Sequence, residues 1–447
     1  MKKVITYGTY DLFHQGHYNL LKRAKALGDY LIVGVTSDVF DLNRGKLNVR
    51  DSLIRRIENV KKTGFADEII VEEYMGQKID DIKKYDIDIF TVGSDWRGHF
   101  DYLSEYCQVH YLERTKGVSS TDIRNNEAVN IGIIGAENIV RRFCDEAKYV
   151  SGLEIVGIYA EMDRIDFAQK LAVENELCVY KSLDDMLDKV DAVYVCAPPK
   201  THYHYTKYAL ESGKHVICEF PFCLNVDEAK ELFAIAESNQ SILLHGLKTA
   251  YTPAFQRMIS LAKTGMIGNI IAVDASFTQV LGSNLSTQVR VSSGGSVNAL
   301  GEYPLLAFIK LLGSKFKKVA FFSRFNHDYN VDGYTRFYLQ YENAMATATV
   351  AIEAKSEGDM TITGTKGYLY IPAPWWKTEY FEVRFEDINK NMKYFYKFQG
   401  EGLRYELAEF VKCILLGQQS FCLTKEETLA MVNVLDGFNN RKNVSVF

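Results

Sequence analysis

Two segments of the chain, far apart in the sequence, begin with the same pattern. Each runs from a short β-branched stretch through a glycine-bearing turn into an amphipathic stretch, first at 4–17 and again at 129–147. In both regions further short apolar runs alternate with helical stretches, which predicts parallel sheets joined by right-handed crossovers. With 447 residues the chain is expected to hold two to four domains, because domains are typically about 100–200 residues long.

The texture of the sequence changes twice. The first α/β pattern closes near Asn126, and after Leu247 longer β-rich stretches replace the alternation, which is typical of an antiparallel sheet. We therefore expect an α/β protein with three domains, at 1–126, 127–246 and 247–447. The first would be a Rossmann-like parallel sheet, the second a dinucleotide-binding Rossmann domain, and the third an α+β domain with a large, mostly antiparallel sheet.

Charge and composition narrow the function classes. The net charge of −5 provides no basic field, so we expect no nucleic-acid partner and only small, specific anion sites. The 8 cysteines form no CxxC pair, which suits buried thiols in a reducing compartment. The start of the chain has no extended apolar region, and no run approaches the ~20 apolar residues of a membrane span. These features predict a soluble, cytoplasmic protein with no membrane partner.

The segment GTYDLFHQGH at 8–17 is the strongest functional signal. A turn that leads into a helix N-terminus presents free backbone N–H groups and the positive end of the helix dipole, which is where phosphate binds. His14 and His17 lie at this point, and both imidazoles can donate hydrogen bonds to phosphate oxygens as a bond to pyrophosphate breaks. The segment RTKGVSST at 114–121 adds cations, hydroxyls and a possible helix cap, which also suit a triphosphate.

With a third motif, GSDWRGHFDYL at 93–103, these segments make residues 1–126 resemble the glycerol-3-phosphate cytidylyltransferases of the HxGH nucleotidyltransferase superfamily. The resemblance implies in-line transfer of CMP from CTP, with Mg²⁺, to a small alcohol phosphate. It assigns catalytic roles to His14, His17, Arg114 and Lys46. It assigns nucleotide binding to Gly8, Thr9, Tyr10, Asp11, Gly16, Asp95, Trp96, Thr115, Ser119, Ser120 and Thr121.

The resemblance also makes Lys46 and Arg56 partners of the acceptor phosphate. Two departures bear on the acceptor, because Ser94 stands where relatives usually have a second Asp and Gly64 where they usually have an Arg. Glycerol phosphate is the first expectation, while ribitol-type and other alcohol phosphates remain open. No dedicated metal cage is expected, since Mg²⁺ tends to use substrate phosphates and waters.

Residues 129–447 resemble the Gfo/Idh/MocA oxidoreductases, through NIGIIGAENI at 130–139, the stretch at 193–221 and GGSVNALGEYPLLA at 294–307. The resemblance implies an NAD(P)-binding Rossmann half and a sheet domain that holds substrate. Several residues that would carry this chemistry are changed. The remnant of the cofactor site comprises Gly135, Glu137, Ala160, Glu219, Phe220 and Tyr303.

Glu137 replaces the glycine nearest the pyrophosphate, which adds bulk and a like charge. Ala160 occupies the place of the ribose-binding acid, next to Glu161. Phe220 replaces the lysine of the family's Glu-Lys-Pro motif, and Ala299 stands where the family has its catalytic acid. These losses favour a second half that is non-catalytic or altered, which leaves NAD(P) as an uncertain cofactor.

Two alternatives remain. The second half could be an active reductase that makes the polyol precursor, or a scaffold that forms a dimer or recruits another enzyme. A homo-oligomer is expected in either case. The pair His202 and His204 has no third ligand at metal-site spacing, so a structural role is favoured.

Overall fold

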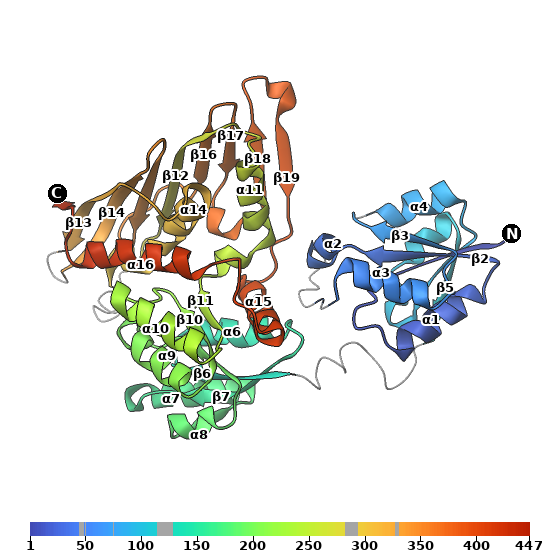
Figure 1. Ribbon diagram of the computed structural model, residues 1–447, viewed down its shortest axis with the longest axis horizontal. Helices are drawn as coiled ribbons and strands as arrows, with labels where there is room; N and C mark the ends of the chain where they lie inside the picture. Colours follow the sequence, from blue (N-terminus) through green and yellow to red (C-terminus); the bar gives the residue numbers. More distant parts are fainter. Residues whose placement is uncertain (44–48, 50, 75, 114–127, 282–293, 327–329) are drawn as a thin grey trace. The chain divides into compact units, whose positions relative to one another are not determined.

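The computed structural model describes residues 1–43, 49, 51–74, 76–113, 128–281, 294–326 and 330–447 (Figure 1). The chain divides into two compact units, Met1–Ala128 and Val129–Phe447. Each unit is described by itself.

The first unit is built on a five-stranded parallel sheet in the order β3-β2-β1-β4-β5. Its strands are β1 (Lys3–Gly8), β2 (Tyr30–Thr36), β3 (Glu68–Glu72), β4 (Ile89–Gly93) and β5 (Gln108–Leu112). Its helices are α1 (Gln15–Lys25), α2 (Asp38–Asn43), α3 (Leu53–Lys62), α4 (Gln77–Tyr85), η1 (Ser94–Trp96) and η2 (Asp101–Glu105).

Both faces of this sheet are covered, which explains the near-continuous apolar strands. Val4 of β1 packs on one side in a core with Leu21 of α1 and Val60 of α3. Ile5 packs on the other side with Ile82 of α4. The strand order reverses between β1 and β4, so the carboxyl ends of these strands define the switch point where open parallel sheets bind ligands.

The second unit begins with a six-stranded parallel sheet in the order β11-β10-β9-β6-β7-β8. Its strands are β6 (Val129–Ile134), β7 (Leu153–Tyr159), β8 (Cys178–Tyr180), β9 (Ala192–Val195), β10 (His215–Glu219) and β11 (Leu243–Gly246). Its helices are α6 (Ile139–Ala147), η3 (Met162–Arg164), α7 (Ile165–Asn175), α8 (Leu183–Leu187), η4 (Pro199–Thr201), α9 (His202–Glu211) and α10 (Val226–Ser238).

A nine-stranded sheet follows, in the order β19-β18-β17-β16-β12-β15-β14-β13-β20. Its neighbours are antiparallel except β12 with β15 and β13 with β20. The strands are β12 (Ile270–Thr278), β13 (Lys318–Asn326), β14 (Val331–Gln340), β15 (Met345–Ala351), β16 (Met360–Gly364), β17 (Tyr368–Ile371), β18 (Tyr380–Arg384), β19 (Met392–Phe395) and β20 (Val444–Val446).

Helices lie along one face of this large sheet, as α14 and α16 do in Figure 1. The helical segments are η5 (Lys248–Tyr251), α11 (Pro253–Lys263), α13 (Gly295–Leu300), α14 (Glu302–Leu312), η6 (Trp375–Lys377), η7 (Ile388–Lys390), α15 (Leu403–Leu416) and α16 (Lys425–Asn439). The expected fold class, parallel Rossmann-like sheets with a large and mostly antiparallel sheet, is confirmed.

The last two helices return to the six-stranded sheet. Arg404 of α15 donates from Nε to Glu146 of α6 at 2.8 Å, and its Nη2 donates to the other carboxylate oxygen at 2.9 Å. Val432 of α16 is fully buried in the same core as Leu232 of α10. Among the described residues no helix has the length and apolar character needed to cross a membrane.

Candidate functional site

The turn after β1 has a backbone that its sequence must accommodate. Tyr10 and Leu12 have positive φ angles of 55° and 47°, which non-glycine residues seldom adopt. Tyr10 is buried with its ring beneath Gly8, where an added Cβ would lie 2.9 Å from the ring. Glycine is therefore needed at position 8 for this turn to close over the tyrosine.

His14 and His17 lie together at the N-terminus of α1. His14 is the N-cap residue, and its Nδ1 accepts a hydrogen bond from the backbone N–H of Gly16 at 3.0 Å. In the neutral form this bond places the remaining proton on Nε2, which can then donate to a ligand. The two imidazole rings stack, with centroids 3.9 Å apart and an interplanar angle of 19°. The structure thus brings both predicted histidines to the N-terminus of a helix at the switch point, a site suited to phosphate.

Carboxylates hold the turn to the segment before α3. The Asp11 carboxylate accepts from the backbone N–H of Asp51 at 2.9 Å, and the Asp51 carboxylate accepts from the N–H of Leu12 at 3.2 Å. Thr9 donates its hydroxyl to Asp41 at 3.0 Å. Asp11 is buried, so its contacts fix the turn on which His14 is carried.

Arg56 lies under this turn and has no exposed surface. Its Nη1 donates to the carbonyl oxygens of Thr9 and Thr36, both at 2.8 Å, and its Nη2 pairs with Asp38. Nη1 also lies 3.4 Å from the fully buried Asp41. The sequence assigned Arg56 to the acceptor phosphate, and that role stays a prediction. In the structure its buried guanidinium contacts the turn, α2 and β2 and has no exposed surface.

An open cleft of about 580 Å³ lies beside the turn. Phe13 and Tyr18 line it on one side, while Arg55, Asn59 and Lys62 of α3 line it on the other. These three α3 residues were not predicted from the sequence. Their spacing of four and then three residues places them on one helix face, so a helical plot that showed a polar face towards the turn would have found them.

The remaining predicted residues of the first unit fall into two groups. Asp95 and Trp96 form η1 at the end of β4, and both are exposed. Their nucleotide-binding role stays a prediction. Six others lie outside the described residues: Lys46, Arg114, Thr115, Ser119, Ser120 and Thr121.

The turn after β6 in the second unit carries different side chains from the turn after β1. Gly135 has a φ of 118°, and an added Cβ would lie 2.6 Å from the backbone nitrogen of Ala197. The side chain of Glu137 pairs with Arg164 at 3.3 Å. Burial raises the pKa of Glu137, and the nearby Arg164 lowers it in part. A carboxylate and its partner thus occupy the turn where the resemblance implied a pyrophosphate.

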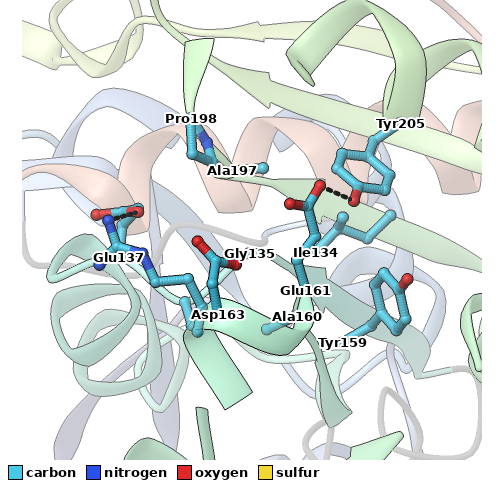
Figure 2. Close-up of a pocket in the computed structure, with 12 residues that line it drawn as sticks. Ile134, Gly135, Glu137, Tyr159, Ala160, Glu161, Asp163, Ala197, Pro198 and Tyr205 are labelled. Atoms are coloured by element: carbon cyan, nitrogen blue, oxygen red, sulfur yellow. Dashed lines mark hydrogen bonds and ion pairs between the residues drawn. The ribbon is translucent and has the colours of Figure 1, made fainter. Parts of the chain in front are cut away.

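Glu137 and Ala197 line two separate hollows along the carboxyl edge of the six-stranded sheet. The smaller one has a volume of about 30 Å³, which is room for about one water molecule. Glu161, the acid next to Ala160, accepts a hydrogen bond from the Tyr205 hydroxyl at 2.5 Å, as Figure 2 shows. The ribose-binding part of the expected cofactor site is therefore narrow, and its acid already has a partner.

The larger hollow has a volume of about 300 Å³. Phe220 and Tyr303 form one wall, with ring centroids 5.2 Å apart in an edge-to-face arrangement. Glu219 also lines it, and Tyr194 donates its hydroxyl to this carboxylate. His202 is buried with ring nitrogens 2.9 Å from the Pro221 carbonyl and 2.6 Å from the Ala197 carbonyl, as a structural residue would be. In the described part of the chain no three His, Cys, Asp or Glu side chains form a metal-binding group.

Comparisons with known proteins divide the chain where the two compact units meet, near residue 128. Residues 5–126 match the cytidylyltransferase-like family. Residues 129–247 match the oxidoreductase family with an NAD-binding Rossmann fold, and residues 255–370 match the GFO/IDH/MocA C-terminal domain.

Individual relatives match the same two parts of the chain. The glycerol-3-phosphate cytidylyltransferase of Bacillus spizizenii is 52% identical over 128 residues, which are 29% of this chain and 98% of that protein. The trans-1,2-dihydrobenzene-1,2-diol dehydrogenase of Macaca fuscata fuscata is 26% identical over 286 residues, 61% of this chain and 83% of that protein.

A solved structure covers the second part of the chain. The 3-ketoreductase KijD10 from Actinomadura kijaniata, solved with NADP and TDP-benzene, aligns with a TM-score of 0.64 at 22% identity, over 72% of this chain and 99% of its own. At this identity the likeness shows the fold alone. The protein is therefore a member of the cytidylyltransferase-like family through its first unit, fused to a Gfo/Idh/MocA oxidoreductase region.

Proposed function

We propose that the first unit transfers CMP from CTP to a small alcohol phosphate, with glycerol 3-phosphate as the first candidate, and releases pyrophosphate. The stacked pair of His14 and His17 at the N-terminus of α1 carries this proposal. The Bacillus spizizenii relative, named for glycerol 3-phosphate, supports the choice of acceptor.

In this reaction an oxygen of the acceptor phosphate attacks the α-phosphorus of CTP in line, and the bond to pyrophosphate breaks. The Nε2–H of His14, the imidazole of His17 and the positive N-terminal end of α1 would stabilise the charge that develops on the phosphate oxygens. Mg²⁺ would enter as part of the MgCTP substrate, as expected for an ion held largely by phosphates and water.

We place the acceptor in the 580 Å³ cleft between the turn and α3. Arg55 and Lys62 line this cleft and supply two cations for the acceptor phosphate. Asp51 lies 3.2 Å from Arg55 and would orient its guanidinium. These residues take over the role that the sequence had assigned to Arg56.

A panel of alcohol phosphates with CTP, followed by pyrophosphate release, tests the proposal. Glycerol 3-phosphate should give the highest kcat/KM, and no turnover with any member of the panel would refute the activity. Lys62→Met should raise KM for the acceptor about tenfold while leaving KM for CTP unchanged. Lys61→Met is the matched control, because Lys61 is an exposed neighbour that does not line the cleft.

For the second unit we propose that dinucleotide binding has been lost. The Glu137–Arg164 ion pair carries this proposal, since it fills the turn after β6 with a negative charge. The residues present do not fit a dinucleotide, so the role proposed for this unit has no step through NAD(P). Tight NADPH binding by the wild-type protein, together with oxidation of NADPH by a ketone, would favour the alternative of an active reductase.

The scaffold alternative, the homo-oligomer and the cytoplasmic location stay predictions. Light scattering on the full chain tests the second of these, with a monodisperse monomer as the contrary result.

A further inference from the structure

Two buried ionisable side chains line the larger hollow of the second unit, and a third buried one interacts with both of them electrostatically. Glu219 ends β10, Lys248 begins η5, and Glu406 lies in the first turn of α15. They are 8%, 9% and 0% exposed, respectively. Glu219 and Lys248 line the hollow directly. Three segments far apart in the sequence thus converge on one small space.

The contacts of these groups are incomplete. Tyr194 orients Glu219 through a hydrogen bond. Neither carboxylate oxygen of Glu406 has a hydrogen-bond partner in the part of the chain that the structure describes. Among the same residues, the Lys248 ammonium forms no ion pair or hydrogen bond. A buried ionisable group without a hydrogen-bond partner is unfavourable for folding, so such groups beside a hollow are candidates for a functional site.

A structural ion pair on the same helix shows the difference. Arg404, two residues before Glu406, contacts both carboxylate oxygens of Glu146, at 2.8 and 2.9 Å. In that pair both carboxylate oxygens accept hydrogen bonds, and the pair links α15 to α6. Glu406 lies deeper than Arg404 yet makes no comparable contact, so packing alone does not account for its carboxyl group.

Electrostatics indicates the charge states. Burial raises the pKa of Glu406 well above its usual value, and the nearby Glu219 raises it further, which favours a neutral carboxylic acid. Burial raises the pKa of Glu219 to about 7. Burial lowers the pKa of Lys248 although Glu406 and Glu219 oppose the shift, so the neutral amine is favoured more than in an exposed lysine. A neutral lysine amine that faces a hollow, beside a carboxyl group able to transfer protons, is a nucleophile.

We propose that the larger hollow is a covalent small-molecule site in which the Lys248 amine forms an imine with a compact hydroxyketone or hydroxyaldehyde. The hollow of about 300 Å³ suits a compact molecule. Glu219 can accept hydrogen bonds from its hydroxyl groups, and the rings of Phe220 and Tyr303 cover its carbon skeleton.

The step is balanced without another reactant. The Lys248 nitrogen attacks the carbonyl carbon, the C–N bond forms, and the carbonyl electron pair moves onto oxygen. Glu219 relays the two amine protons to that oxygen, which leaves as water when the C=N bond forms. Glu406 acts as a positioning residue, whose neutral carboxyl group avoids a permanent ammonium at Lys248.

Reductive trapping tests the proposal. The full chain is treated with dihydroxyacetone or glyceraldehyde and sodium cyanoborohydride, and peptides are analysed by mass spectrometry. A saturable adduct on Lys248 is expected, forming about 10²-fold faster than on the exposed Lys263 of α11. Equal labelling of both lysines, or no adduct on Lys248, would overturn the proposal.

Variants separate chemistry from folding. Lys248→Met removes the amine without adding a permanent charge, and it should abolish the adduct while the second unit keeps its thermal unfolding transition. Glu219→Gln should slow trapping at Lys248, whereas Glu406→Gln, which resembles the neutral acid, should leave it within about twofold of wild type. If Glu219→Gln traps at the wild-type rate, the proton relay is wrong. His14→Ala should not affect trapping, so failure here is distinct from failure of cytidylyl transfer.

Discussion

The chain has the same local structure after β1 and after β6. In both places a parallel strand ends at a switch point, and a glycine-bearing turn leads from it into a helix. In the first unit the turn carries two stacked imidazoles and is held from below by a buried arginine. In the second unit Glu137 and Arg164 occupy the turn themselves. Under the proposed functions, one backbone geometry presents donors to an anion in the first unit and excludes the anion in the second, and the side chains beside the helix N-terminus make the difference.

Of the substitutions discussed, replacing Arg56, which contacts the turn after β1, should have the largest effect on the free energy of unfolding. Arg56→Met leaves Asp41 and the carbonyl groups of Thr9 and Thr36 without their donor, so the free energy of unfolding of the first unit should fall by about 3–5 kcal/mol. Arg55→Met is the matched control, with an expected change within about 0.5 kcal/mol because its side chain is 71% exposed. Denaturant unfolding measures both, and similar values would remove the distinction between these neighbours.

The imidazole pair should matter for rate rather than stability. His14→Ala removes the donor proposed for the CTP phosphates, so kcat for cytidylyl transfer should fall by about 10²–10³-fold. His110→Ala changes an exposed histidine on β5 and should leave kcat unchanged. A His14→Ala enzyme with wild-type kcat would show that the turn after β1 is as inactive as the turn after β6.

A change of pH should affect the second unit through Asp332. Burial raises the pKa of this carboxyl group to about 6, although Thr335 donates to it at 2.8 Å. Because its folded-state pKa lies above the ~3.9 of an unfolded aspartate, the folded state binds the proton more tightly. The free energy of unfolding should then fall as the pH rises from about 4 to about 6, by at most about 3 kcal/mol.

Calorimetry at pH 4 and pH 7 measures this change. Asp332→Asn cannot titrate at this position and should lose the part of the dependence that Asp332 contributes, while the part due to the raised pKa of Glu219 and of Glu406 remains. An unchanged pH profile in the variant would assign the effect to other groups.

Removing the Glu137 side chain from the turn after β6 should restore part of the affinity for NADPH. Glu137→Gly removes the bulk and the negative charge, so the affinity for NADPH should rise about tenfold, or ~1.4 kcal/mol. Glu176→Gly is the control, since it removes one charge at an exposed C-cap whose φ of 57° suits glycine. NADPH fluorescence measures binding, and tight binding by the wild type would break the comparison between the turns.

The sequence allowed the sheets and the histidine pair to be predicted, because strand periodicity and a helix N-terminus are local patterns. The amphipathic pattern of the sequence is clear only from about Tyr18, whereas α1 begins at Gln15. Histidine is not among the favoured N-cap residues, so His14 gives no capping signal in the sequence.

Other features depend on residues brought together by packing. Arg56 lies in an amphipathic stretch where arginine is expected at the surface, and only its partners on α2 and in the turn make burial tolerable. The group of Glu219, Lys248 and Glu406 joins three distant segments. No local pattern indicates such a convergence. The division of the second half at residue 247 stays a prediction.

The return of α15 and α16 to the six-stranded sheet has a consequence for biosynthesis. Val432 completes a core that otherwise consists of residues from the Rossmann half, and Arg404 closes on Glu146. The Rossmann core of the second unit therefore stays incomplete on the ribosome until translation has passed Val432. The first unit has its own core and sheet, so it can fold while the remaining residues are still being translated.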